Sequence, residues 1–148
     1  MDLKESLNES MKAAMKGGDE VRKRTVRMVI AAVKQAEVDR QTTLDDAGVI
    51  AVIQKEIKNR REALEESKKA QRADLVDANQ AEITVLEAFL PAAIPANELR
   101  LLAQAAIAET GAASPADMGK VMKIVMGKVA GRAPGDVVSQ VVRELLQK

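Results

Sequence analysis

The sequence of 148 residues contains no cysteine and no histidine, and Phe89 is its one aromatic residue. Without cysteine there is no disulfide, no zinc–thiolate site and no thiol nucleophile, so glutamine hydrolysis by a cysteine is excluded. Without histidine, no serine can use an imidazole as its general base. With one aromatic side chain, unpaired bases have almost nothing to stack on, which argues against a reader of single-stranded nucleic acid.

The sequence also lacks long hydrophobic runs and any excess of one charge. No apolar stretch approaches the roughly 20 residues of a membrane span, and the first ten residues lack the pattern of a signal peptide. We therefore expect a soluble, cytoplasmic protein without membrane association. The 23 basic and 22 acidic side chains give a formal charge of +1, so any attraction to a polyanion must come from a local surface.

Apolar residues make up 47% of the chain and recur mostly at helical spacing, while no segment alternates as a half-buried strand would. The sequence therefore predicts an all-α protein. Pro91 and Pro95 forbid a continuous helix between them. They predict a linker over residues 91–95, between a four-helix N-terminal domain (1–90) and a three-helix domain (96–148).

The first two helices have clear boundaries in the sequence. One is expected over residues 2–16 and ends at Gly17-Gly18. The next is expected to begin after Asp19 as N-cap and to end near Arg40, with Met28 on its buried face.

The third and fourth helices are expected to pair. Thr43 is a candidate N-cap for the third, and a bend at residues 70–73 separates it from the fourth, which covers residues 74–90 and buries Leu75. The short link predicts a long antiparallel hairpin, and the many charges between residues 55 and 72 are most simply explained as its solvated surface.

The C-terminal domain is expected to contain three short helices. The first begins at Pro95 or Asn97 and ends at Gly111, and the third has Asp136 as its N-cap. Between them, residues 114–132 predict one helix with a basic face.

This middle helix carries good end signals. Ser114 is suited to the N-cap, Pro115 to the first helical position, and Asp117 to a variant of the capping box. Gly131 stands where a left-handed C-cap residue is expected. Gly127 is most simply explained by close packing of helices.

The basic residues of this helix are the first candidate binding site. They can contact phosphates, which would position a nucleic acid without reading its sequence. The simpler alternative is a solvated helix face. The candidate residues are Lys120, Lys123, Lys128 and Arg132.

A second basic patch is expected on the helix that follows Asp19. Its alternative explanation as solvated surface is stronger, because Glu20 and Glu37 are near. The patch comprises Arg22, Lys23, Arg24, Arg27 and Lys34.

No constellation for catalysis is present. Gly127-Lys128 lacks the spacing, the hydroxyl residue and the preceding strand of a phosphate-binding loop. The adjacent pairs Asp45-Asp46 and Glu65-Glu66 point to different faces of a helix, so they do not form a metal site. We therefore assign no catalytic residue, no metal ligand and no cofactor.

Several short motifs resemble one known family. The runs Gly119-Lys120-Val121-Met122-Lys123 and Gly131-Arg132-Ala133 are similar to the tail domain of the B subunit of tRNA-dependent amidotransferases (GatB). With Gln71-Arg72-Ala73-Asp74-Leu75 and Phe89-Leu90-Pro91, the chain resembles the free-standing YqeY family over essentially its whole length. In the amidotransferase tail, the segment between the two glycine motifs is shorter by about one helical turn.

The resemblance implies tRNA as a binding partner, because the similar tail engages tRNA while amidation occurs elsewhere in that complex. It also carries the family label of a carbon–nitrogen ligase with glutamine as amide donor, which would require a partner such as an amidotransferase. The main alternative is a protein–protein adaptor that uses the charged hairpin at residues 55–90 or a Met-lined groove. An unrecognised enzyme would need carboxylates with strongly shifted pKa values in a closed cleft.

Overall fold

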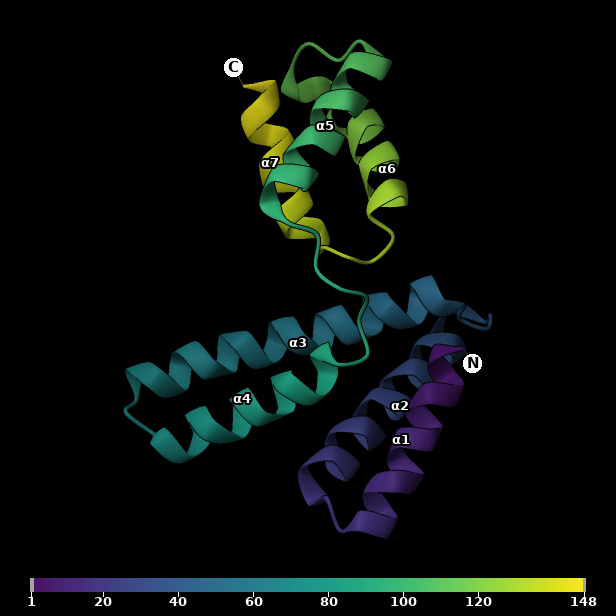
Figure 1. Ribbon diagram of the computed structural model, residues 1–148, viewed down its shortest axis with the longest axis vertical. Coiled ribbons are helices and arrows are strands. Elements are labelled where there is room, and N and C mark those ends of the chain that lie inside the picture. The colour runs from purple at the N-terminus through teal and green to yellow at the C-terminus, as the bar shows by residue number, and fades with distance from the viewer. Residues whose placement is uncertain (1, 148) are drawn as a thin grey trace. The chain divides into compact units, whose positions relative to one another are not determined.

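The computed structural model describes residues 2–147. It contains the helices α1 (Leu3–Gly17), α2 (Glu20–Arg40), α3 (Asp46–Lys69), α4 (Ala73–Glu87), α5 (Ala96–Thr110), η1 (Pro115–Asp117, a 3₁₀ turn), α6 (Met118–Val129) and α7 (Gly135–Leu146) (Figure 1). The described residues contain no strand, which confirms the all-α prediction. The chain divides into two compact units, Met1–Leu90 and Pro91–Lys148.

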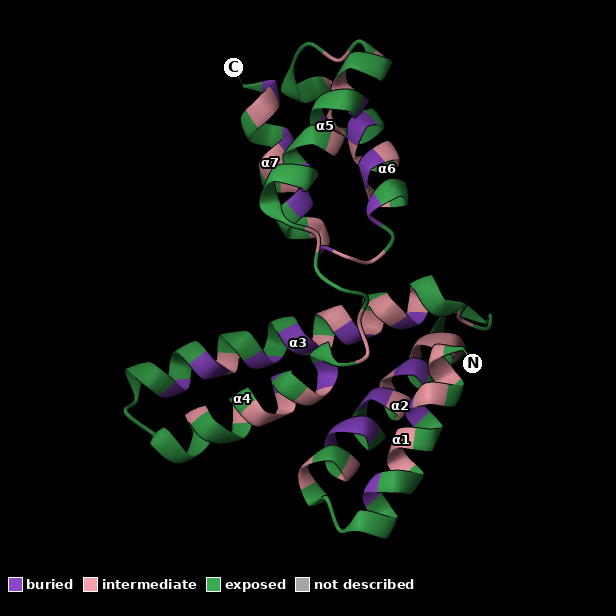
Figure 2. Ribbon diagram, viewed as in Figure 1, coloured by how far each residue is buried: buried purple, intermediate pink, exposed green. Residues whose placement is uncertain are grey.

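In the N-terminal unit, α1 pairs with α2 and α3 pairs with α4, and α2 packs against both members of the second pair (Figure 1). Buried residues occur on all four helices and form one core (Figure 2). Because no aromatic residue is fully buried, branched aliphatic side chains must fill the space between the helices. The core consists of Leu7, Val26, Val29, Val33, Val49, Ile53, Ile57, Leu64, Ile83 and Leu86.

The boundary between α1 and α2 follows the sequence signals. Gly18 adopts a left-handed conformation with φ of 70°, which ends α1 at little steric cost. The Asp19 carboxylate then accepts a hydrogen bond from the Arg22 backbone N–H at 3.1 Å. This confirms the prediction of Asp19 as the N-cap of α2.

The prediction of Thr43 as the cap of the third helix is wrong. Asp45 is the N-cap of α3, and its carboxylate accepts from the Gly48 N–H at 2.9 Å. The preceding loop is tied to α2, because Leu44 N–H donates to Glu37 at 2.7 Å. With the chain held there, the stronger carboxylate acceptor of Asp45 reaches the open end of the helix.

Two apolar side chains do not lie where the periodicity placed them. Met28 is 47% exposed and Leu75 is 41% exposed, whereas both were expected in the core. Val26 takes the inward position on α2 instead and is fully buried. Apolar residues surround much of α2, so its packing against α1, α3 and α4 decides which of them turn inward.

In the C-terminal unit, α5, α6 and α7 each pack against the other two (Figure 1). Buried residues occur on all three helices (Figure 2), and most of those in their shared core are alanine or valine. It comprises Leu99, Ala103, Ala106, Val121, Val125, Val129, Ala133, Val138, Val142 and Leu146.

The segment expected as one helix from Ser114 to Arg132 is divided. Residues Pro115–Asp117 form the 3₁₀ turn η1, and α6 begins only at Met118. The Ser114 side chain makes no capping hydrogen bond, whereas the Asp117 carboxylate accepts from the Ala113 N–H at 3.1 Å. The Asp117 side chain thus stabilises the turn by a hydrogen bond to the residue before Ser114, and Ser114 itself does not cap the helix.

The two other end signals of this unit are displaced by one or two residues. Ala130, with φ of 51°, is the left-handed C-cap of α6, and Gly131 follows it with φ of 83°. α7 begins at Gly135 after Pro134, so Asp136 lies in the first turn and is not the N-cap. There its carboxylate still favours the positive end of the helix dipole.

Candidate nucleic-acid interface

α6 presents two unpaired lysines to solvent. Val121, Val125 and Val129 bury one side of the helix completely, and Lys120 and Lys123 lie on the exposed remainder. Neither lysine forms an ion pair or hydrogen bond with any residue between 2 and 147. The helix contains no acidic residue, so the charged side chains on its exposed surface are all positive.

Lys128 also lies on the surface, but it has a partner. Its Nζ is 3.9 Å from Glu109 Oε2 on α5, and the two side chains are 48% and 62% exposed. An exposed pair of this kind contributes at most about 1 kcal/mol. Glu109 therefore offsets the charge of Lys128.

Arg132 has a structural role. Its Nε donates to the Ala92 carbonyl at 3.0 Å, and its own carbonyl accepts from the Ile94 N–H at 3.1 Å. These two bonds fasten the segment after Pro91 to the end of α6. The structure therefore separates the four predicted residues into two unpaired lysines, one paired lysine and one arginine that binds backbone.

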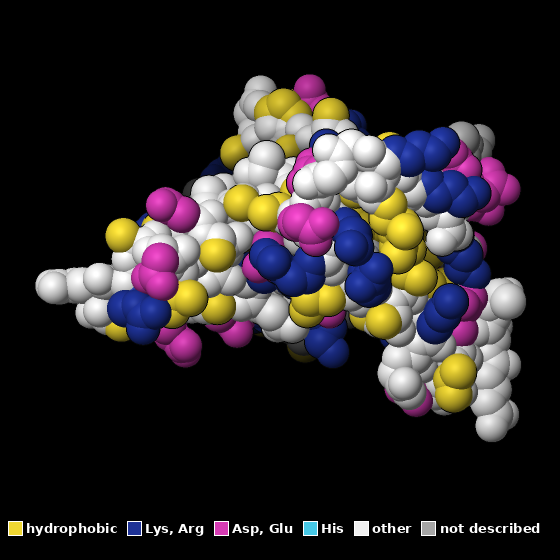
Figure 3. Space-filling view, turned by 90° about the horizontal axis from the view of Figure 1, so that it is seen from below, with side chains coloured by type: hydrophobic (Ala, Val, Ile, Leu, Met, Phe, Trp, Pro, Cys, Tyr) yellow, Lys and Arg dark blue, Asp and Glu magenta, His cyan; other side chains and the backbone are white. Residues whose placement is uncertain are grey.

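The second patch, on α2, is mostly offset by acidic neighbours. Arg22 lies 3.7 Å from Asp19, Lys23 lies 3.7 Å from Glu20, and Arg24 lies 3.9 Å from Glu82. The remaining members, Arg27 and Lys34, are exposed and without an ion pair to any described residue. On the face that Figure 3 shows, basic side chains likewise lie among acidic and apolar ones.

Arg60 lies along the apolar side of α3 and is 7% exposed. Its Nη1 donates to Glu56 at 2.7 Å, its Nε lies 3.8 Å from Glu82, and its Nη2 lies 3.6 Å from Met28 Sδ. Arg60 thus connects α3 to α2 and α4. Its position seven residues after Ile53 and four before Leu64 is the sequence signal for this burial.

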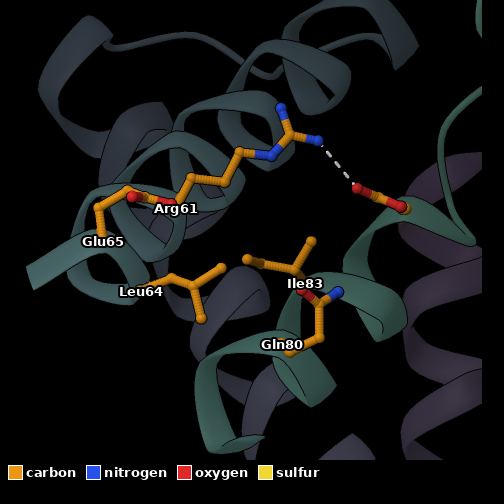
Figure 4. A pocket seen from close by; sticks show the side chains of 6 residues that line it. Arg61, Leu64, Glu65, Gln80 and Ile83 are labelled. Atoms are coloured by element: carbon orange, nitrogen blue, oxygen red, sulfur yellow. Dashed lines mark hydrogen bonds and ion pairs between the residues drawn. The ribbon is translucent and has the colours of Figure 1, made fainter. Parts of the chain in front are cut away.

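An open pocket of about 440 Å³ lies between α3 and α4 (Figure 4). Leu64 and Ile83 give it an apolar floor. Arg61 Nη2 donates to Glu87 Oε1 at 2.9 Å at its edge (Figure 4). The other lining residues are Glu65 and Gln80.

Two carboxyl groups have shifted pKa values, and both shifts have structural causes. The hydrogen bond from Lys4 and that from Leu44 N–H lower the pKa of Glu37. The bidentate contact with Arg72, at 3.1 and 3.0 Å, lowers the pKa of Asp74. Both carboxyl groups are stabilised as anions, which is the opposite of what a general acid needs.

Residues 2–147 contain no group of three or more Asp or Glu side chains arranged to hold a metal ion. None of the helices in this range combines the length and the apolar character needed to cross a membrane.

The chain is similar to a known family and to several fungal proteins. The family model described as Yqey-like protein matches residues 4–146. A Pyrenophora tritici-repentis protein named "Altered inheritance of mitochondria protein 41, mitochondrial" is 30% identical over 146 residues, which cover 95% of this chain and 78% of that protein.

A protein of the same name from Lachancea thermotolerans is 32% identical over 91 residues, or 61% of this chain and 49% of the relative. An uncharacterized protein of Schizosaccharomyces pombe is 30% identical over 89 residues, or 60% of this chain and 69% of the relative. The match therefore spans about half the length of the Lachancea protein.

Proposed function

This chain belongs to the YqeY family, and from that premise we propose that it is an accessory RNA-binding module whose RNA is tRNA. Residues 96–148 resemble the tail domain of the amidotransferase B subunit (GatB), and that tail engages tRNA. We assign no reaction to the chain itself. Glutamine-dependent amidation of a misacylated tRNA, the carbon–nitrogen ligase activity attached to the family, would be performed by a partner enzyme.

The observation that carries the proposal is the exposed surface of α6. Lys120 and Lys123 project from it without ion-pair partners among residues 2–147, and the helix has no acidic residue. Unpaired lysines can exchange their counterions for phosphates, which supplies sequence-independent affinity for RNA. Phe89 is the single aromatic residue and lies in the other unit, so base stacking contributes little and folded RNA is the compatible ligand.

The location of the protein is part of the same proposal. We propose a cytoplasmic protein, where aminoacylated tRNA is available to such a module. The matched relatives from Pyrenophora and Lachancea are named as mitochondrial proteins. Fractionation of cells that express a tagged chain would decide between the two compartments.

The test is tRNA binding at about 50 and about 200 mM salt, with the native chain and the variant Lys120→Ala/Lys123→Ala. Loss of two phosphate contacts should lower the slope of log K against log salt by about 1.4–1.8. Arg27→Ala/Lys34→Ala is the matched control, because it removes two unpaired, exposed cations from α2. Equal effects of the two variants, or no effect of the first, would remove the α6 assignment.

A second candidate function is a protein–protein adaptor, and the pocket between α3 and α4 favours it. The pocket combines the apolar floor of Leu64 and Ile83 with the charged pair of Arg61 and Glu87 (Figure 4). An adaptor of this kind would bind its partner with little dependence on salt, and Ile83→Glu would abolish that binding. Loss of residues 91–148 would leave it intact.

A further inference from the structure

Two glycines in α6 have no structural explanation within the chain. Gly119 and Gly127 are both exposed, and a Cβ added to either would meet nothing within 4 Å. Their backbone lies in the helical range that alanine adopts equally well, unlike Gly18 and Gly111, which have φ of 70°. The interpretation of Gly127 as a site of close helix packing is therefore wrong for this chain.

Glycine is the least favourable residue for a helix interior apart from proline. Gly119 is the second residue of α6 and Gly127 is the third from its end, and neither has a positive φ. Alanine would therefore fit at both places without strain and would stabilise the chain by restricting its unfolded state. Gly48 shows the contrast within this chain, because an added Cβ there would approach the Leu44 side chain to 3.0 Å.

The two glycines lie on the same surface as the unpaired lysines. Each residue turns a helix by about 100°, so Lys123 and Gly127, two residues to either side of Val125, point about 160° away from it. Val125 is fully buried, and its direction marks the core. Gly119 precedes Lys123 by about one helical turn, so it lies on the same side of α6, and Lys120 lies next to both. The outward surface therefore carries two ammonium groups and two positions without a side chain.

The charge of this surface limits what can lie against it. The charged side chains of α6 are all positive, and Lys120 and Lys123 have no carboxylate partner in the described chain. A polyanion there meets the two ammonium groups and bare helix backbone at Gly119 and Gly127, while Glu109 of α5 is paired with Lys128. Glycine is suited to sites where a ligand approaches the main chain closely.

We propose that the phosphodiester backbone of a folded RNA lies directly against the main chain of α6 at Gly119 and Gly127, held by Lys120 and Lys123. This inference rests on the proposed function and specifies its contact. Recognition at this surface uses the shape of the RNA backbone and does not read bases. Lys128, paired with Glu109, lies outside the contact.

The test replaces both glycines, as Gly119→Ala/Gly127→Ala in the full chain, and measures binding of a folded tRNA transcript. The added methyl groups should weaken binding by at least about tenfold, which corresponds to about 1.4 kcal/mol. Because no charge changes, the salt slope should stay that of the native chain. The melting temperature should rise by a few degrees, since both alanines are compatible with the helix.

Gly17→Ala is the matched control. Gly17 is also exposed and helical with open space around its Cβ position, but it belongs to α1 in the other unit. It should leave tRNA binding unchanged. The single variants Gly119→Ala and Gly127→Ala are measured as well. For each of them, tRNA affinity and melting temperature are determined, so that the contribution of each glycine is separated from any change in stability.

The outcomes separate this inference from the proposed function. Native-like affinity in the double glycine variant, with binding that still depends on Lys120 and Lys123, would overturn the close contact alone. Absence of tRNA binding by the native chain would overturn both. Weaker binding together with a raised melting temperature supports both.

Discussion

Replacing Arg60 by alanine should destabilise the N-terminal unit by about 3 kcal/mol. The side chain is 8% exposed, and its loss leaves Glu56, 21% exposed, without a cation and Glu82, 15% exposed, with only the exposed Arg24 at 3.9 Å. Breaking a buried pair by removing one partner costs roughly 3–5 kcal/mol. We expect the lower end, because both carboxylates keep some contact with water and the Arg60 Nε makes no hydrogen bond.

The matched control is the adjacent residue. Arg61 pairs with Glu87 at 2.9 Å, but these side chains are 57% and 49% exposed, so Arg61→Ala should cost less than about 1 kcal/mol. Urea unfolding followed by circular dichroism gives the free energies of unfolding. Hydrogen exchange of the α2, α3 and α4 amides then assigns the loss to this unit.

A second comparison tests the cause. Arg60→Met combined with Glu56→Gln and Glu82→Gln removes the charges and keeps most of the buried volume, so it should recover most of the stability lost in Arg60→Ala. Equal losses in Arg60→Ala and Arg61→Ala would refute the reasoning from burial. Failure of the triple variant to recover would show that the ion pairs contribute more than packing does.

Two more predictions concern the loop between α2 and α3. The pKa of Glu37 is lowered by Lys4 and Leu44, so its contribution to stability is present above its ordinary pKa of about 4.3 and is lost as the pH falls through the lowered value. Melting temperatures measured against pH should therefore fall less steeply in acid for Glu37→Gln than for the native chain. Asp45→Ala should cost about 1 kcal/mol in urea unfolding, because it removes the cap of α3. Thr43→Ala should change the free energy of unfolding little. A larger loss of stability in Thr43→Ala than in Asp45→Ala would identify Thr43 as the cap.

Signals that act within a few residues predicted some helix ends correctly and misplaced others by one to three residues. The end of α1 and the start of α2 were predictable because a single N-cap candidate, Asp19, follows the glycines that end α1. In the structure Gly18 is the C-cap of α1 and Asp19 is the N-cap of α2. Thr43 competed with Asp45, two residues away, for the next helix. The choice depended on Glu37 holding the loop, a contact that spans seven residues and has no local signature.

Burial and pairing across the chain were harder to predict. Met28 and Leu75 fit the helical period yet are exposed, because the packing of whole helices decides which apolar stripe turns inward. The basic candidates show the same limit. Lys128 is paired with a residue of another helix, and Arg132 binds a carbonyl 40 positions earlier, so their side chains serve contacts that spacing along α6 could not reveal.

The open space around Gly127 could not be predicted from the residue type alone. From the sequence, a glycine inside an apolar helix is most simply a place where two helices touch. In the structure Gly127 lies on the solvent side of α6, as shown by the absence of any atom within 4 Å of the place where its Cβ would be. The sequence did contain the position of Gly127 relative to Val125, which would have placed it opposite the core.

The fastening of Ala92 by Arg132 fixes where a separately expressed C-terminal fragment should begin. A fragment that starts at Ala96, the first residue of α5, would lose the carbonyl that receives the guanidinium and would also lose Ile94, which packs on the core. Its exposed arginine would then be available to any nearby phosphate. Such a fragment would bind RNA more strongly than the intact chain, because its Arg132 is released from Ala92. Binding studies on isolated fragments should therefore begin at Pro91.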